Sequence, residues 1–109
     1  MAIHHLDSGE TTTLALGSAL ASSETTVLVK TPNLEVIRLV VPAGKKIPPH
    51  QAPGEITVQC LEGRVAFDAH DKRQELTAGT FLHLPAGEPH AREGIEDASG
   101  LVTILLAKS

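Results

Sequence analysis

The sequence is poor in aromatic side chains. Phe67 and Phe81 are the only two among 109 residues, and Tyr and Trp are absent. The core must therefore be built from Val, Leu, Ile and Ala, which suffice because 41% of the residues are hydrophobic. Sites for sugars, nucleobases and quaternary ammonium groups often use aromatic faces, so the composition argues against ligands of those kinds.

Clustered positive charge and long apolar runs are also lacking. The formal net charge is −4, and the Lys and Arg residues are scattered, so no basic stripe is available for a nucleic-acid backbone. No apolar stretch approaches the roughly 20 residues that span a bilayer. Cys60 is the only cysteine, which excludes an internal disulfide and agrees with a reducing compartment. We expect a cytoplasmic protein with neither nucleic-acid nor membrane partners.

Short runs rich in β-branched residues begin near residue 25 and alternate with Pro, Gly and polar clusters, which is typical of strands joined by turns. No long amphipathic helix is indicated. Eight short strands predict an all-β sandwich or barrel. The expected strands are Thr26–Lys30, Leu34–Val41, Glu55–Leu61, Arg64–Ala69, Gln74–Leu76, Thr80–Leu84, His90–Glu93 and Leu101–Ala107.

The first 25 residues have only weak periodicity and several Ser and Thr. We assign residues 1–25 to an N-terminal arm or edge strand, with a partner-contacting segment as the remaining alternative, and residues 26–109 to the barrel domain. The adjacent His4 and His5 lie in this arm, where a solvated pair is expected.

A glycine, a proline, a second glycine and a histidine recur at a distinctive spacing in the segment GTFLHLPAGEPH, as Gly79, Pro85, Gly87 and His90. Gly79 permits the turn into a strand, and Pro85 and Gly87 end that strand sharply before His90 begins the returning one. This segment resembles the second motif of the cupin superfamily. The resemblance implies a small single-domain cupin, an antiparallel double-stranded β-helix also described as a jelly-roll barrel.

The first cupin motif is degenerate in this sequence. Gly44, His50 and Gly63 fall on it in GKKIPPHQAPGEITVQCLEG, but Ala52 stands at the second histidine position and Ile56 at the glutamate position. The second motif also departs at its end, because Gly94 stands where the family commonly has Asn.

The resemblance also implies a metal centre, which in the family uses three histidines and one glutamate. Here His50 and His90 are retained, and the fold would bring them face to face. Glu55 is the candidate third ligand, although it lies one residue from the family position. A shift of one residue turns a side chain to the opposite face of a regular strand, so Glu55 would need a bulge near Pro53-Gly54 to reach the site.

The candidate metal ligands are therefore His50, His90 and Glu55, and the candidate cofactor is a divalent metal such as zinc, iron, nickel or manganese. The alternative is that both histidines are cavity residues held by hydrogen bonds without a metal, while Glu55 opens a strand on the solvent side. His83 shares a strand face with Phe81 and is expected at the surface. Cys60 alternates with Ile56 and Val58, which predicts a buried thiol, with a nucleophile or soft ligand as the alternative.

Three functions stay open at this point. The leading hypothesis is a protein that binds a small molecule between His50 and His90, with or without a divalent metal. The second is a metal-dependent enzyme, such as a dioxygenase, isomerase or decarboxylase of a small acid. The third is a non-catalytic sensory or interaction module. No residue is assigned a catalytic role, and whether the protein is an enzyme stays open.

The strand expected at Leu34–Val41 is apolar on both faces for much of its length, as expected if one face meets the core and the other a partner. Together with the resemblance, this pattern predicts a homodimer. Size-exclusion chromatography with light scattering should give about twice the chain mass of 11.5 kDa. A monomer at micromolar concentration would contradict the prediction.

Overall fold

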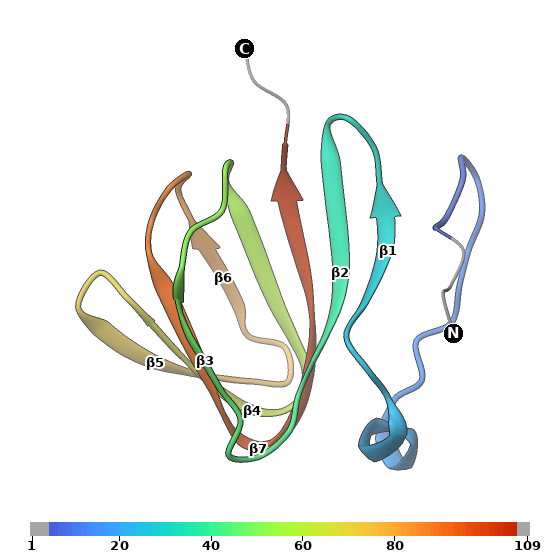
Figure 1. The fold of residues 1–109 in the computed structure, drawn as a ribbon. Coiled ribbons are helices and arrows are strands. Elements are labelled where there is room, and N and C mark those ends of the chain that lie inside the picture. Colours follow the sequence, from blue (N-terminus) through green and yellow to red (C-terminus); the bar gives the residue numbers. More distant parts are fainter. Residues whose placement is uncertain (1–4, 107–109) are drawn as a thin grey trace.

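The computed structural model describes residues 5–106, without the side chains of residues 18, 19 and 21. His4 and Ala107, the end of the last expected strand, lie outside the described residues. Figure 1 shows a short 3-10 turn, η1, followed by seven strands that pair in antiparallel fashion. Their bounds are η1 Gly17–Ser22, β1 Thr26–Lys30, β2 Leu34–Val41, β3 Lys46–His50, β4 Ile56–Ala69, β5 Lys72–Thr77, β6 Phe81–Leu84 and β7 His90–Leu105.

The two longest strands, β4 and β7, connect the two halves of the barrel. They pair with each other from Ile56 opposite Ile104 to Ala69 opposite His90. On its other edge β4 pairs first with β6 and then with β5, while β7 pairs first with β3 and then with β2. One face is thus β1-β2-β7-β4-β6, and the other is β3-β7-β4-β5 (Figure 1). The all-β, jelly-roll prediction is confirmed.

The β4 strand passes from one face to the other at Gly63. The ladder between β4 and β7 shifts register several times between Cys60 and Val65, which is the signature of bulges. Gly63 has a φ of 78°, and a Cβ atom there would collide with the backbone carbonyl oxygen of Asp97. Only glycine satisfies both conditions, so Gly63 allows the strand to bend without breaking its pairing.

Strand continuity is where the sequence expectations and the structure differ. The strands at Thr26–Lys30 and Leu34–Val41 have the expected bounds, but two expected pairs of short strands are each one long strand, β4 and β7. The strand β3 was not expected, because it contains Pro48 and Pro49. These prolines are tolerated because β3 lies at an edge and pairs only with β7, with a shifted register between Ile47 and His50.

The core lies between the two faces and is built from the inward side of each strand. In the first part of β4 burial alternates as the sequence pattern predicts, with Ile56, Val58 and Cys60 buried. Cys60 is buried, and burial raises the pKa of its thiol above the ordinary value, so the structure favours a packing role over a nucleophile. The buried apolar residues are Leu39, Val41, Ile56, Val58, Cys60, Val65, Ala66, Phe67, Leu76, Leu84, Ala98 and Val102.

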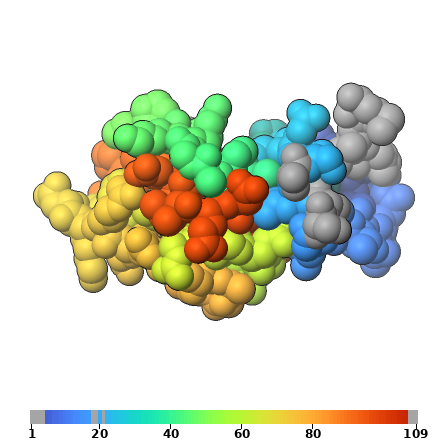
Figure 2. All heavy atoms as spheres, turned by 90° about the horizontal axis from the view of Figure 1, so that it is seen from below, coloured from blue at the N-terminus to red at the C-terminus, as the bar shows by residue number. Residues whose placement is uncertain are grey.

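Residues 5–25 form an arm that contacts its own barrel. The Leu6 amide donates a 2.8 Å hydrogen bond to the carbonyl of Leu28 in β1, and no strand is formed within residues 5–25. In Figure 2 the arm, in blue, lies at the opposite end of the molecule from the β5 hairpin, in yellow. The arm reaches the outer side of β2, so that side has a neighbour within the chain, and the homodimer stays a prediction.

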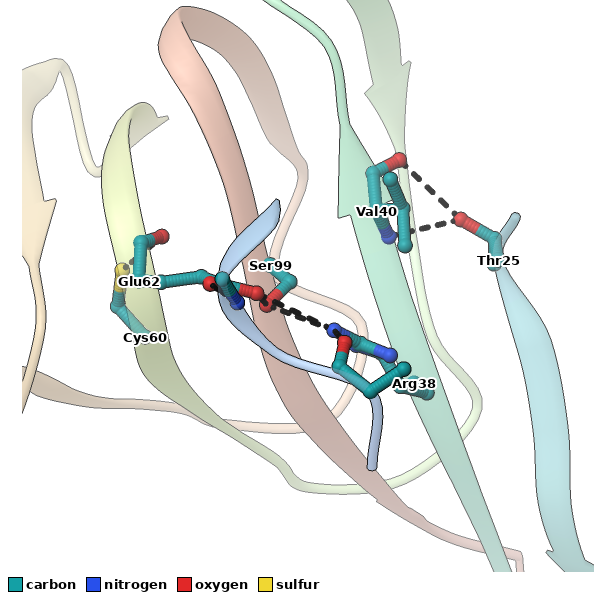
Figure 3. A network of polar contacts seen from close by, with 8 residues as sticks. Thr25, Arg38, Val40, Cys60, Glu62 and Ser99 are labelled. Carbon is teal, nitrogen blue, oxygen red and sulfur yellow. Dashed lines mark hydrogen bonds and ion pairs between the residues drawn. The ribbon is translucent and has the colours of Figure 1, made fainter. Parts of the chain in front are cut away.

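A network around Arg38 fastens the arm to the sheet (Figure 3). The Arg38 Nη2 donates to the Ala15 carbonyl at 2.8 Å, to Ser99 Oγ at 3.2 Å and to Glu62 Oε2 at 3.3 Å. Ser99 Oγ donates to Glu62 Oε2 at 2.6 Å, and the Gly17 amide donates to Glu62 Oε1 at 2.8 Å. The hydrogen bond from Ser99 is the main reason that the pKa of Glu62 is lowered.

This network predicts a specific loss of stability. Glu62→Gln keeps the size of the side chain but leaves the buried Arg38 without its counter-charge, and should lower the free energy of unfolding by about 1–3 kcal/mol. Urea unfolding measures this, and hydrogen exchange should accelerate at Gly17. The control is Glu75→Gln, whose partner Arg64 is 41% exposed, and which should lose clearly less stability than Glu62→Gln. Equal losses in both variants would contradict the network.

Candidate functional site

Two histidines meet at one end of the barrel. His50 ends β3 and His90 begins β7, and the two residues are direct cross-strand partners. Their ring centroids are 4.4 Å apart, with the ring planes tilted by 59°. The predicted meeting of these two residues, separated by 40 positions in the sequence, is therefore present in the structure.

Each of these imidazoles is oriented by a backbone carbonyl two residues before it in the chain. His50 Nδ1 lies 3.2 Å from the carbonyl oxygen of Pro48, and His90 Nδ1 lies 3.0 Å from that of Glu88. A carbonyl oxygen only accepts, so in each neutral ring the proton is assigned to Nδ1. The Nε2 atom of each ring is left as a hydrogen-bond acceptor or ligand.

Burial distinguishes the two rings. His50 is exposed, whereas His90 is only 4% exposed and stacks on Phe67 with a centroid distance of 6.3 Å. Burial lowers the pKa of His90 below its ordinary value, and the nearby His50 and Arg92 add to this effect, while the hydrogen bond to the Glu88 carbonyl opposes it. Burial therefore favours the neutral form of the His90 imidazole.

A cavity of about 180 Å³ opens beside the two histidines and extends into the barrel. The polar side chains on its wall are His50, Gln51, His90 and Arg92, together with Thr25. An engineered apolar cavity of about 150 Å³ holds benzene, so this one suits a ligand of roughly six to eight non-hydrogen atoms. The apolar wall includes Ile37, Leu39, Ile56, Val58, Val102 and Ile104.

Arg92 is the cavity residue that sequence reasoning missed. It lies two positions after His90 on β7, and alternation puts residues two apart on the same face of a strand. That spacing was readable from the sequence, but a charged residue is by default assigned to the solvent side. In the structure Arg92 is partly buried, its Nε atom is fully buried without a hydrogen-bond partner, and burial lowers the pKa of its guanidinium.

Glu55 lies apart from the two histidines. Ala52 and Ile56, at the positions where the family has a histidine and a glutamate, both line the cavity, whereas Glu55 does not. The Glu55 side chain lies outside the cavity. It is 58% exposed, and its Oε1 lies 2.8 Å from Nε2 of His83. His83 is itself 57% exposed, as expected for a surface residue.

The residues present fit a tightly held metal poorly. A catalytic zinc normally has three protein ligands, and non-haem iron takes two histidines and a carboxylate. Within residues 5–106, no group of three or more His, Cys, Asp or Glu residues is arranged to hold a metal ion. The Arg92 cation, which lines the same cavity, would repel a second positive charge. The assignment of His50, His90 and Glu55 as joint metal ligands stays a prediction, and only the first two lie together.

Comparison with known proteins bears on the fold. A protein of unknown function from Streptococcus pyogenes, SPY1581, is 20% identical, with a TM-score of 0.77 and coverage of 100% of each chain. An RmlC-like cupin from Desulfovibrio desulfuricans is 22% identical, with a TM-score of 0.74 and coverage of 89% of this chain and 96% of that one. The DMSP lyase DddQ from Ruegeria pomeroyi is 24% identical, with a TM-score of 0.70 and coverage of 86% of this chain and 53% of that one.

The match to a protein family covers more than half of the chain. None of the curated proteins compared with the sequence matches it. The family model described as "Cupin domain" matches residues 37–104, a range that includes both histidines, β4 and nearly all of β7. This chain belongs to the cupin domain family.

Proposed function

We propose that this protein binds a small organic ligand in the barrel cavity, and that His50 and His90 hold it by accepting hydrogen bonds at their Nε2 atoms. The observation that carries the proposal is the pair of imidazoles at the wall of a largely apolar cavity, each with its Nδ1 atom already hydrogen-bonded to a backbone carbonyl. Concave, mostly apolar pockets with a few convergent polar groups are the usual form of small-molecule sites.

The chemistry of the wall narrows the ligand to one with an apolar body and a hydrogen-bond donor. Aliphatic side chains make most of the wall and favour a branched hydrocarbon of matching size. A hydroxyl or amide N–H on that body would donate to Nε2 of one imidazole. The proposal invokes no resident metal, because the donor set of the described residues fits a divalent ion poorly.

The proposal is tested with α-hydroxyisobutyramide, a neutral probe that has two methyl groups and a hydroxyl donor. NMR titration of the labelled protein should show shifts at amides around the cavity. His50→Ala should weaken binding about three- to tenfold, because one hydrogen bond is lost. His83→Ala is the matched control: it also removes an exposed histidine, but one that lies outside the cavity, and should leave the affinity unchanged.

Two further outcomes decide the proposal. Addition of EDTA should not change the affinity for the probe, and a loss of binding restored by zinc would show that a metal mediates it. Equal weakening by His50→Ala and His83→Ala would contradict the assignment of the site. His50 is exposed, so its variant is expected to fold.

The burial of His90 predicts a pH dependence of stability. Its pKa is lowered in the folded protein, so as the pH falls below about 6.5 the unfolded chain takes up a proton that folded His90 resists. Its contribution to stability is thus complete above that pH and decreases as the pH falls toward the folded pKa. NMR should give a titration midpoint for His90 below that of free histidine.

A variant isolates this contribution. His90→Asn keeps a donor for the Glu88 carbonyl but does not titrate, so it should lose less stability than the wild type between neutral and mildly acidic pH. Superimposable wild-type and His90→Asn profiles would refute the lowered pKa.

A further inference from the structure

Arg92 is a cation on the cavity wall that has no partner among the described residues. It lies on β7 opposite Ile47 of β3 and Phe67 of β4, between the two faces of the barrel. Its Nε atom is buried, and within residues 5–106 its guanidinium makes no hydrogen bond or ion pair. A buried polar group in this state is destabilising, and native proteins contain few of them, so it needs an explanation.

The charges around Arg92 leave it uncompensated. The cavity is lined by Arg92, His50 and His90 as its titratable residues, and no Asp or Glu side chain lines it. On its other side Arg92 borders a second pocket of about 430 Å³, to which Glu24 and Lys45 also contribute. Glu24 forms no ion pair with Arg92 in the described part of the chain, so the positive charge is available to a bound molecule.

We propose that Arg92 makes the cavity selective for small organic acids, by binding their carboxylate. This inference rests on the proposed function, and names the class of ligand that the same cavity takes. A guanidinium is planar and offers parallel N–H donors that match the two oxygens of a carboxylate. A cavity of about 180 Å³ with aliphatic walls leaves room for a short branched chain, but not for a large molecule.

The guanidinium of Arg92 and the imidazoles of His50 and His90 then bind different groups of the ligand. Arg92 donates to the carboxylate at one end of the ligand, and Nε2 of His50 or His90 accepts from a hydroxyl near it. A neutral imidazole is suited to this role, because it accepts a hydrogen bond without adding a second positive charge. The ligand class is therefore a short hydroxy acid with an aliphatic body.

The test compares α-hydroxyisobutyrate with α-hydroxyisobutyramide, which share shape and hydroxyl but differ in charge. The wild type should bind the acid at least about tenfold more tightly than the amide, a difference of about 1.4 kcal/mol. Arg92→Met should weaken binding of the acid much more than binding of the amide, and so remove this preference. Lys45→Met is the matched control, since it removes a cation from the adjacent pocket that does not line the cavity, and should keep the preference.

The outcomes separate this inference from the proposed function. Equal affinity of the wild type for acid and amide would overturn the role of Arg92, while binding of the amide would still support the small-molecule site. Failure of both probes to bind would overturn both. A preference for the acid that survives in Arg92→Met would refute the inference. A preference that disappears equally in Lys45→Met would assign the selectivity to net charge and would also refute it.

Thermal unfolding gives a second test that does not depend on the affinity measurements. Met is close in size to Arg and leaves no buried cation, so Arg92→Met should melt no lower than the wild type without ligand. The acid should raise the melting temperature of the wild type and not that of Arg92→Met. Arg92→Lys keeps the charge without the planar pair of donors and should show an intermediate preference. An equal shift by the acid in all three proteins would overturn the inference.

Discussion

The antiparallel ladder between β4 and β7 is the interaction on which the rest of the structure depends. These strands run through both faces of the barrel, and each side chain on them points inward or outward according to its position in the alternation. The strands bend where they pass from one face to the other, and this bend requires close contact between backbone atoms. A Cβ atom at Gly63 would meet the Asp97 carbonyl, and one at Gly94 would meet the carbonyl oxygen of Pro42. That contact also explains why glycine stands at position 94, where the family commonly has Asn.

Two arginines, Arg38 and Arg92, have buried Nε atoms without a hydrogen-bond partner, but their terminal nitrogens differ in what they contact. Arg38 uses one terminal nitrogen to contact a carboxylate, a hydroxyl and a carbonyl, and so joins the arm to the sheet. Arg92 makes no such contacts in residues 5–106, although it lies in the same barrel. A partly buried and unpaired cation is costly, so packing does not account for Arg92. The carboxylate ligand that we propose would supply the missing anion.

Much of the fold was predictable from local sequence signals. Turn residues and β-branched runs gave the exact bounds of β1 and β2, and the motif spacing brought His50 and His90 together. The continuity of β4 and β7 was not readable, because a bulged strand and two strands joined by a turn share the same glycine signal. The strand β3 was hidden by its prolines, which are excluded from central strands but tolerated at an edge.

The candidate site was predictable only in part. It depends both on which residue at the start of β4 faces the cavity and on the charge of Arg92 across the wall. The alternation along β4 puts Ile56, and not Glu55, on the cavity wall. A glutamate at position 56 would bring a negative charge to the wall that Arg92, His50 and His90 also line. With isoleucine there, the metal ligand set is short of a carboxylate, and the guanidinium keeps its charge. The degenerate first motif and the unpaired Arg92 therefore meet at one cavity, because isoleucine at position 56 brings no carboxylate to the wall that Arg92 also lines.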